Sequence, residues 1–173
     1  MGIEVSLAAV VLAGLWMWFI GWATALAVID IREHRLPNAM VGVCLAGTVV
    51  WVGALAWAAD DVGIALRATM AAVVCVGVFA GGYLIGGMGM GDVKYAAVTG
   101  ATLGSLGWAA VWWGHLLGFV LAGGVVVIGM LSGKLHRRSA IPFGPFMALG
   151  ATMIGLAGLV EVITVGARPV LAG

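Results

Sequence analysis

Long apolar runs, separated by short polar strings, are the feature that most limits what this chain can fold into. The five clearest runs cover about residues 5–29, 39–58, 64–85, 108–131 and 146–165. A helix needs about 20 mostly apolar residues to cross roughly 30 Å of hydrocarbon, and each run is close to that length or longer. The pattern predicts an all-α polytopic membrane protein.

A further apolar segment, at about 93–106, is shorter and is interrupted by Gly100 and Gly104. About 14 helical residues rise only about 21 Å, so this helix is expected to be short or tilted. Counting it gives a bundle of about six transmembrane helices. The 29 glycines are spread through these segments, where small residues let helices pack closely. We expect one membrane-embedded domain that fills residues 1–173.

The composition agrees with a chain that lies mostly in lipid. Hydrophobic residues make up 64% of it and charged residues only 9%, whereas a soluble domain carries about 25% charged residues. The net charge of +1 argues against a nucleic-acid partner, because phosphate binding needs a clustered basic face. Cys44 and Cys75 lie inside apolar runs without a C-x-x-C pattern, so they are interpreted as buried hydrophobic residues, and no metal site is predicted.

Basic residues predict how the helices are oriented. Six of the eight Lys and Arg residues follow the apolar runs at 5–29, 64–85 and 108–131. They are Arg32, Arg35, Lys94, Lys134, Arg137 and Arg138. Cytoplasmic loops of membrane proteins carry an excess of such residues. This distribution predicts termini outside the cytoplasm and a cytoplasmic location for the segments around Asp30 and Asp92.

Those two aspartates are the best indication of chemistry. Asp30 ends the first run in A-V-I-D-I-R, and Asp92 lies in the glycine-rich string G-G-M-G-M-G-D-V-K at 86–94. An ionised Asp in hydrocarbon costs roughly 2.5–3.5 kcal/mol or more, so such residues usually face partners, water or a catalytic centre. Two carboxyl groups that share one proton can act as an aspartyl protease dyad, one as base and one as acid. The alternatives are a boundary charge for Asp30 and a helix N-cap for Asp92.

Other residues near these positions are candidates for shaping a site. Glycines lack a Cβ and let an extended substrate approach, although they also serve in ordinary turns and helix packing. Lys94 is a candidate for biasing the dyad or positioning substrate carbonyls, or it is a positive-inside charge. His115 is interpreted as an interhelical hydrogen-bonding residue. The candidate site-shaping residues are Pro37, Gly87, Gly89, Gly91, Lys94, Pro142, Gly144 and Pro145.

Three ordered motifs resemble the type IV prepilin peptidases, which are membrane aspartyl proteases of the G-x-G-D class. They are Asp30 followed by Leu36-Pro37-Asn38, G-M-G-M-G-D-V-K at 87–94, and I-P-F-G-P-F-M-A-L-G at 141–150. The resemblance implies that Asp30 and Asp92 are the catalytic pair and that proteolysis uses no metal or other cofactor. The implied partner is a type IV prepilin or pseudopilin, cut after its short basic leader and before its hydrophobic helix. The implied location is a bacterial-type inner membrane, with cleavage at its cytoplasmic face.

The chain departs from the larger members of that family. Those members carry cysteine pairs and a methylation-associated segment before the first catalytic Asp, whereas only about 29 residues precede Asp30 here, without a cysteine pair. A protease-only member is therefore expected. Two other classes remain as alternatives. A small transporter or a proton or cation channel, with the two Asp as a relay, predicts a polar path to both membrane faces. A non-catalytic scaffold has no need for these carboxylates.

Overall fold

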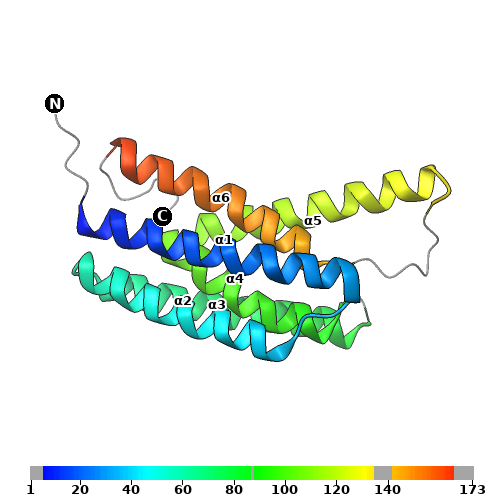
Figure 1. Cartoon of the computed structure of the whole chain (residues 1–173), viewed down its shortest axis with the longest axis horizontal. Helices are drawn as coiled ribbons and strands as arrows, with labels where there is room; N and C mark the ends of the chain where they lie inside the picture. The colour runs from blue at the N-terminus through cyan, green and yellow to red at the C-terminus, as the bar shows by residue number, and fades with distance from the viewer. Residues whose placement is uncertain (1–5, 87, 135–141, 166–173) are drawn as a thin grey trace.

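Six α-helices make up the described part of this chain. The computed structural model describes residues 6–86, 88–134 and 142–165, and these residues contain no strand. Figure 1 shows the helices as an elongated bundle whose members run to and fro along its long axis. Their bounds are α1 Leu7–Glu33, α2 Asn38–Ala58, α3 Val62–Leu84, α4 Met90–Leu106, α5 Trp108–Leu131 and α6 Gly144–Val165.

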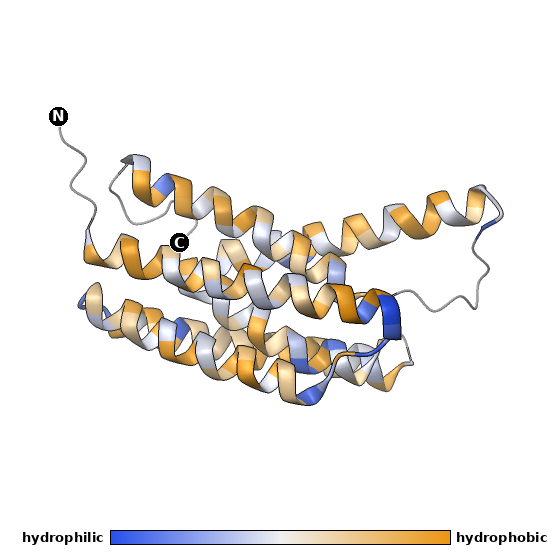
Figure 2. Ribbon diagram, viewed as in Figure 1, coloured by the Kyte–Doolittle hydropathy of each residue, from blue (hydrophilic) through white to orange (hydrophobic). Residues whose placement is uncertain are grey.

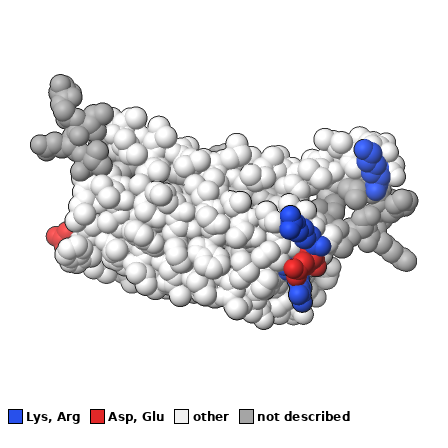
Figure 3. All heavy atoms as spheres, in the orientation of Figure 1, with Lys and Arg blue, Asp and Glu red and all other residues white. Residues whose placement is uncertain are grey.

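Five of the six helices are long and apolar enough to cross a membrane, and α4, with 17 residues, is too short to count among them. Hydrophobic residues cover the helix surfaces along the bundle, and the strongly hydrophilic residues gather mainly at its ends (Figure 2). In the space-filling view the visible charged residues also lie at the two ends, and the flank between them is uncharged (Figure 3). The predicted all-α polytopic membrane fold is confirmed.

The observed helix ends place both aspartates inside helices. We expected the first helix to end near residue 29, but α1 continues to Glu33, so Asp30 lies in its last turn. The helix ends where His34 adopts a left-handed conformation, with φ 51°, and its N–H donates to the carbonyl of Asp30 at 2.9 Å. Similarly, α4 begins at Met90, earlier than expected, and Asp92 lies in its first turn.

The short helix α4 is the centre of the bundle, because it packs against all five others. Glycine makes its contact with α3 close. A Cβ added to Gly100 would lie 2.9 Å from the carbonyl oxygen of Ala71, and one added to Gly104 would lie 2.6 Å from the Ala71 Cβ. Arg67 of α3 also donates from Nε to the carbonyl of Gly104 at 3.1 Å, which satisfies one of the free carbonyls at the end of α4.

A second close contact joins α5 to the beginning of α6. A Cβ added to Gly118 would lie 3.0 Å from the carbonyl oxygen of Phe146, and one added to Gly150 would lie 2.6 Å from the backbone nitrogen of Gly118. Such backbone-to-backbone approach is typical of membrane helices that pack through small residues. It fixes the first turn of α6 against α5, and this turn reaches the candidate site.

Candidate functional site

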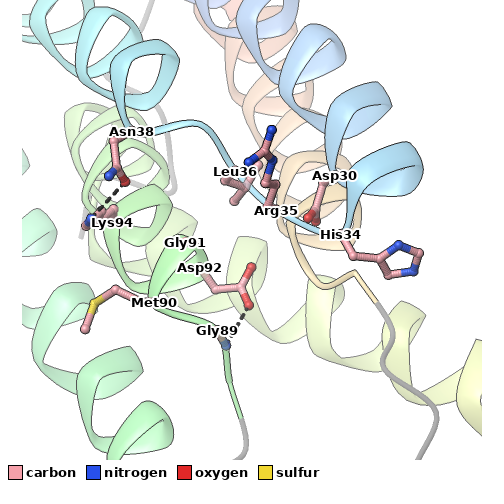
Figure 4. A pocket seen from close by; sticks show the side chains of 10 residues that line it. All are labelled: Asp30, His34, Arg35, Leu36, Asn38, Gly89, Met90, Gly91, Asp92 and Lys94. Carbon is pink, nitrogen blue, oxygen red and sulfur yellow. Dashed lines mark hydrogen bonds between the residues drawn. The ribbon is translucent and has the colours of Figure 1, made fainter.

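A cavity of about 420 Å³ lies at the end of the bundle where α1 ends and α4 begins. Both aspartates line it, and Figure 4 shows their carboxyl groups entering the same space from two different helices. Its lining residues are Asp30, His34, Arg35, Leu36, Asn38, Gly89, Met90, Gly91, Asp92 and Lys94. The structure therefore brings Asp30 and Asp92 to one site, as a dyad requires.

Asp30 is buried, and its carboxylate is held from a distant part of the chain. The side chain is 5% exposed, and its Oδ2 accepts a hydrogen bond from the backbone N–H of Gly144 at 3.1 Å. Gly144 is the first residue of α6, so its N–H belongs to the partly positive end of that helix, which favours a negative group. A Cβ on Gly144 would lie 2.8 Å from the same carboxylate oxygen.

Asp92 is held by its own helix. Its Oδ2 accepts the N–H of Gly89, the N-cap residue of α4, at 3.2 Å. Asp92 is therefore not the N-cap residue of α4, as the alternative had it, but the third residue of the helix, whose side chain accepts from the N-cap backbone. The same side chain also lines the cavity. Burial, partly offset by the Gly89 hydrogen bond and reinforced by the negative charge of Asp30, raises the pKa of Asp92 to about 6.

Two of the three glycines predicted for this loop lie beside the aspartates. Gly89 and Gly91 both line the cavity. A Cβ on Gly91 would lie 3.1 Å from the Cβ of Leu36, and a Cβ on Gly89 would lie 3.3 Å from Asp92 Oδ2. Larger residues at either position would therefore narrow the cavity. Gly87 lies outside the described residues.

Lys94 and the predicted prolines have more varied positions. Lys94 lines the cavity, and its Nζ donates to Oδ1 of Asn38 at 2.8 Å, which links α4 to the beginning of α2 (Figure 4). Pro37 precedes α2 as its N-cap residue and is not among the lining residues. Pro142 and Pro145 flank the segment that contacts Asp30, and they do not line the cavity either.

The sequence prediction left several lining residues out of the site. They are His34, Arg35, Leu36, Asn38 and Met90. Leu36 and Asn38 stand in the L-P-N string after Asp30, which was a signal that could have identified them. Arg35 is tied to the exposed Glu33 by an ion pair of 2.9 Å.

Among residues 6–86, 88–134 and 142–165, no three His, Cys, Asp or Glu side chains gather where they could hold a metal ion.

His115 of α5 donates from Nδ1 to the carbonyl of Val111 at 2.8 Å, and its Nε2 lies 3.1 Å from Thr99 Oγ1 of α4. It is an interhelical hydrogen-bonding residue, as predicted, and it does not line the cavity.

Comparison with known proteins decides the family. The sequence model of the type IV leader peptidase family matches residues 17–133, more than half of the chain and a stretch that contains both aspartates. The chain belongs to the type IV leader peptidase family. No curated protein and no solved structure matches it. The expected family is confirmed, and membership identifies this multi-pass helical protein as a peptidase of the leader-peptidase kind.

Proposed function

We propose that this leader peptidase is an aspartic endopeptidase that removes the basic leader of a type IV prepilin or pseudopilin. Its catalytic groups are the carboxyls of Asp30 and Asp92. The observation that carries the proposal is the cavity that both carboxyls enter from helices far apart in the sequence. Membership of the leader peptidase family supports the substrate class.

The pair acts on a water molecule placed between it and the scissile carbonyl. One carboxylate takes a proton from the water, whose oxygen bonds to the carbonyl carbon. The other carboxyl gives its proton to the carbonyl oxygen as the tetrahedral intermediate forms. On collapse, one hydroxyl of the intermediate returns its proton to the ionised carboxylate and becomes a carbonyl. The C–N bond breaks, and the leaving nitrogen takes the proton that the other carboxyl received from the water. Burial, with a smaller contribution from the negative charge of Asp30, raises the pKa of Asp92 to about 6, which supports a proton held on the pair below that pH.

The glycines in the lining of the cavity support an extended peptide as the substrate. Hydrolysis needs the scissile bond close to both carboxyls, and only side chains without bulk leave room for a peptide backbone there. Gly89 and Gly91 form the wall beside Asp92 and supply that room. The hydrophobic helix of a prepilin would then continue into the bilayer beside the bundle, since the cavity lies at the bundle's end.

The charges support cleavage on the cytoplasmic side of an inner membrane. The end of the bundle that holds the cavity also holds Arg35 and Lys94 in its lining, and Arg32 in the last turn of α1. Basic side chains are visible at this end in Figure 3. Because positive residues accumulate on the cytoplasmic side, we place this end there.

The experiment is leader removal in cells. A candidate prepilin with a short basic leader and a hydrophobic helix is expressed with and without this protein, and leader loss is read as a shift on a gel. We expect the shift only when the protein is present. A prepilin control with the residues around its cleavage site deleted should not shift. If this protein removes the leader from none of the prepilins whose genes neighbour its own, the proposed substrate class is contradicted.

A further inference from the structure

The backbone segment that holds Asp30 is itself held by an aromatic cluster that does not line the cavity. Phe143 directly precedes Gly144, whose N–H donates to Asp30 Oδ2. The Phe143 side chain does not line the cavity. Its ring centroid lies 4.9 Å from that of Phe119 and 6.0 Å from that of Phe79. Such ring separations are typical of favourable aromatic pairs.

The cluster joins Phe143 to two other helices. Phe119 belongs to α5 and Phe79 to α3, and their ring centroids are 5.8 Å apart, so the three rings contact one another pairwise. Phe79 also lies edge-on to His115, with 5.6 Å between ring centroids. His115 in turn is hydrogen-bonded to Thr99 of α4, the helix that carries Asp92. The cluster is therefore connected to α4, which carries Asp92, and through Phe143 to Gly144, which contacts Asp30.

The backbone on either side of Phe143 fixes the orientation of Gly144 relative to the Phe143 ring. The carbonyl of Phe143 accepts from the N–H groups of Phe146 at 3.0 Å and Met147 at 3.2 Å, which begins the hydrogen-bonding of α6. The Gly118 contact with the Phe146 carbonyl fixes the same turn against α5. The Gly144 N–H thus has its direction set by Phe143 before it and by the first turn of α6 after it.

We propose that Phe143 is a positioning residue for catalysis: its ring, packed on Phe119 and Phe79, holds the Gly144 N–H where it orients the Asp30 carboxylate towards Asp92. This inference rests on the proposed function. Loss of the ring would let the segment move and turn the carboxylate away from the attacking water. A displacement of about 1 Å in such a group can lower the rate about 100-fold.

The test uses the purified full-length chain in proteoliposomes. The substrate is a synthetic peptide with a short basic leader joined to about 20 apolar residues. We expect Phe143→Ala to lower kcat about 10- to 100-fold and to leave KM within about 3-fold, because the substrate still meets an intact cavity. Phe143→Tyr keeps the ring and should restore kcat to within about 2-fold of the wild-type value. Phe146→Ala removes an identical side chain three positions further on, outside the cluster, and should retain most of the activity.

Two results would overturn the inference. One is a wild-type kcat for Phe143→Ala, measured under conditions in which Asp30→Asn and Asp92→Asn are inactive. That result would reject the role of Phe143 and would not contradict the proposed dyad. The other is an equal loss of kcat in Phe143→Ala and Phe146→Ala. If Phe143→Ala does not accumulate, Phe143→Leu keeps most of the apolar volume without the ring and takes its place with the same expected loss. Activity in Asp30→Asn or Asp92→Asn would instead contradict the proposed function itself.

Discussion

Gly144 donates its backbone N–H to Oδ2 of Asp30 at 3.1 Å and thereby joins two residues 114 positions apart. The contact is buried, where a hydrogen bond is electrostatically stronger than it is in water. It connects the end of α1 to the beginning of α6, and it gives the segment at 142–145 a role at the site although that segment does not line the cavity.

Gly144→Ala should therefore impair cleavage although alanine favours helices. The added Cβ would lie 2.8 Å from Asp30 Oδ2, so either the carboxylate or the backbone must shift. We expect a loss of about 10- to 100-fold in kcat. Gly123→Ala is the matched control, because a Cβ there meets nothing within 4 Å. Equal activities of the two variants, measured on the same peptide substrate, would show that the Gly144 contact does not matter for catalysis.

The close packing of α3 and α4 gives a prediction about stability. Gly100→Ala would place a Cβ 2.9 Å from the carbonyl oxygen of Ala71, which is backbone and cannot swing aside. Overpacking of this kind costs about 1–3 kcal/mol, so the variant should unfold at a lower temperature in detergent. Gly77→Ala on α3 faces open space and should unfold at the wild-type temperature or above it. An unchanged melting temperature for Gly100→Ala would contradict the close helix contact.

The raised pKa of Asp92 predicts how the rate depends on pH. Asp92 carries its proton below a pKa of about 6 and is ionised above it. If the active enzyme holds one proton on the pair, kcat/KM should fall as pH rises through about 6, because kcat/KM reports groups of the free enzyme. His34 also lines the cavity, so His34→Gln is the control and should keep this decline. A kcat/KM that rises with pH through this range would count against a shared proton.

The orientation of the bundle can be tested by labelling single cysteines with a membrane-impermeant thiol reagent. Cys44 and Cys75 are 0% and 5% exposed, so the background from the native thiols should be low. Asn38→Cys and Lys134→Cys should react only from the cytoplasmic side, and Asp60→Cys only from the opposite side. Labelling of Asn38→Cys and Lys134→Cys from different sides would contradict the topology and the proposed site of cleavage together.

The sequence predicted the helices well because apolar length is a strong signal in lipid. The predicted runs at 39–58 and 108–131 match α2 and α5 within a residue at each end. The predictions for the C-terminal end of α1 and for the start of α4 were less accurate, since Asp30 and Asp92 were treated as boundaries. Both instead lie inside helical turns, stabilised by the His34 cap and the Gly89 N–H. Polarity alone does not reveal such local hydrogen bonds.

The site was only partly predictable for a different reason. Asp30, Asp92 and the glycines were identified because charged and flexible residues stand out among apolar ones. The contact of Gly144 with Asp30 depends on how α6 packs on α1, and the contact of the Phe143 and Phe119 rings depends on how the start of α6 packs on α5. No spacing in the sequence encodes either contact. Phe143 in particular is a residue type that is common throughout membrane helices, so only the fold distinguishes it from the other phenylalanines of the chain.

The central claim is that Asp30 and Asp92 form one catalytic unit. The most direct measurement is leader removal by Asp30→Asn, Asp92→Asn and the double variant, each at the protein level of the wild type. Asparagine keeps the size and the hydrogen-bonding capacity but cannot exchange the proton, so each single variant should be inactive and the double variant hardly worse. Glu33→Gln, at an exposed carboxylate beside the site, should keep most of its activity. Substantial cleavage by either Asp30→Asn or Asp92→Asn would remove that residue from the pair and contradict the account.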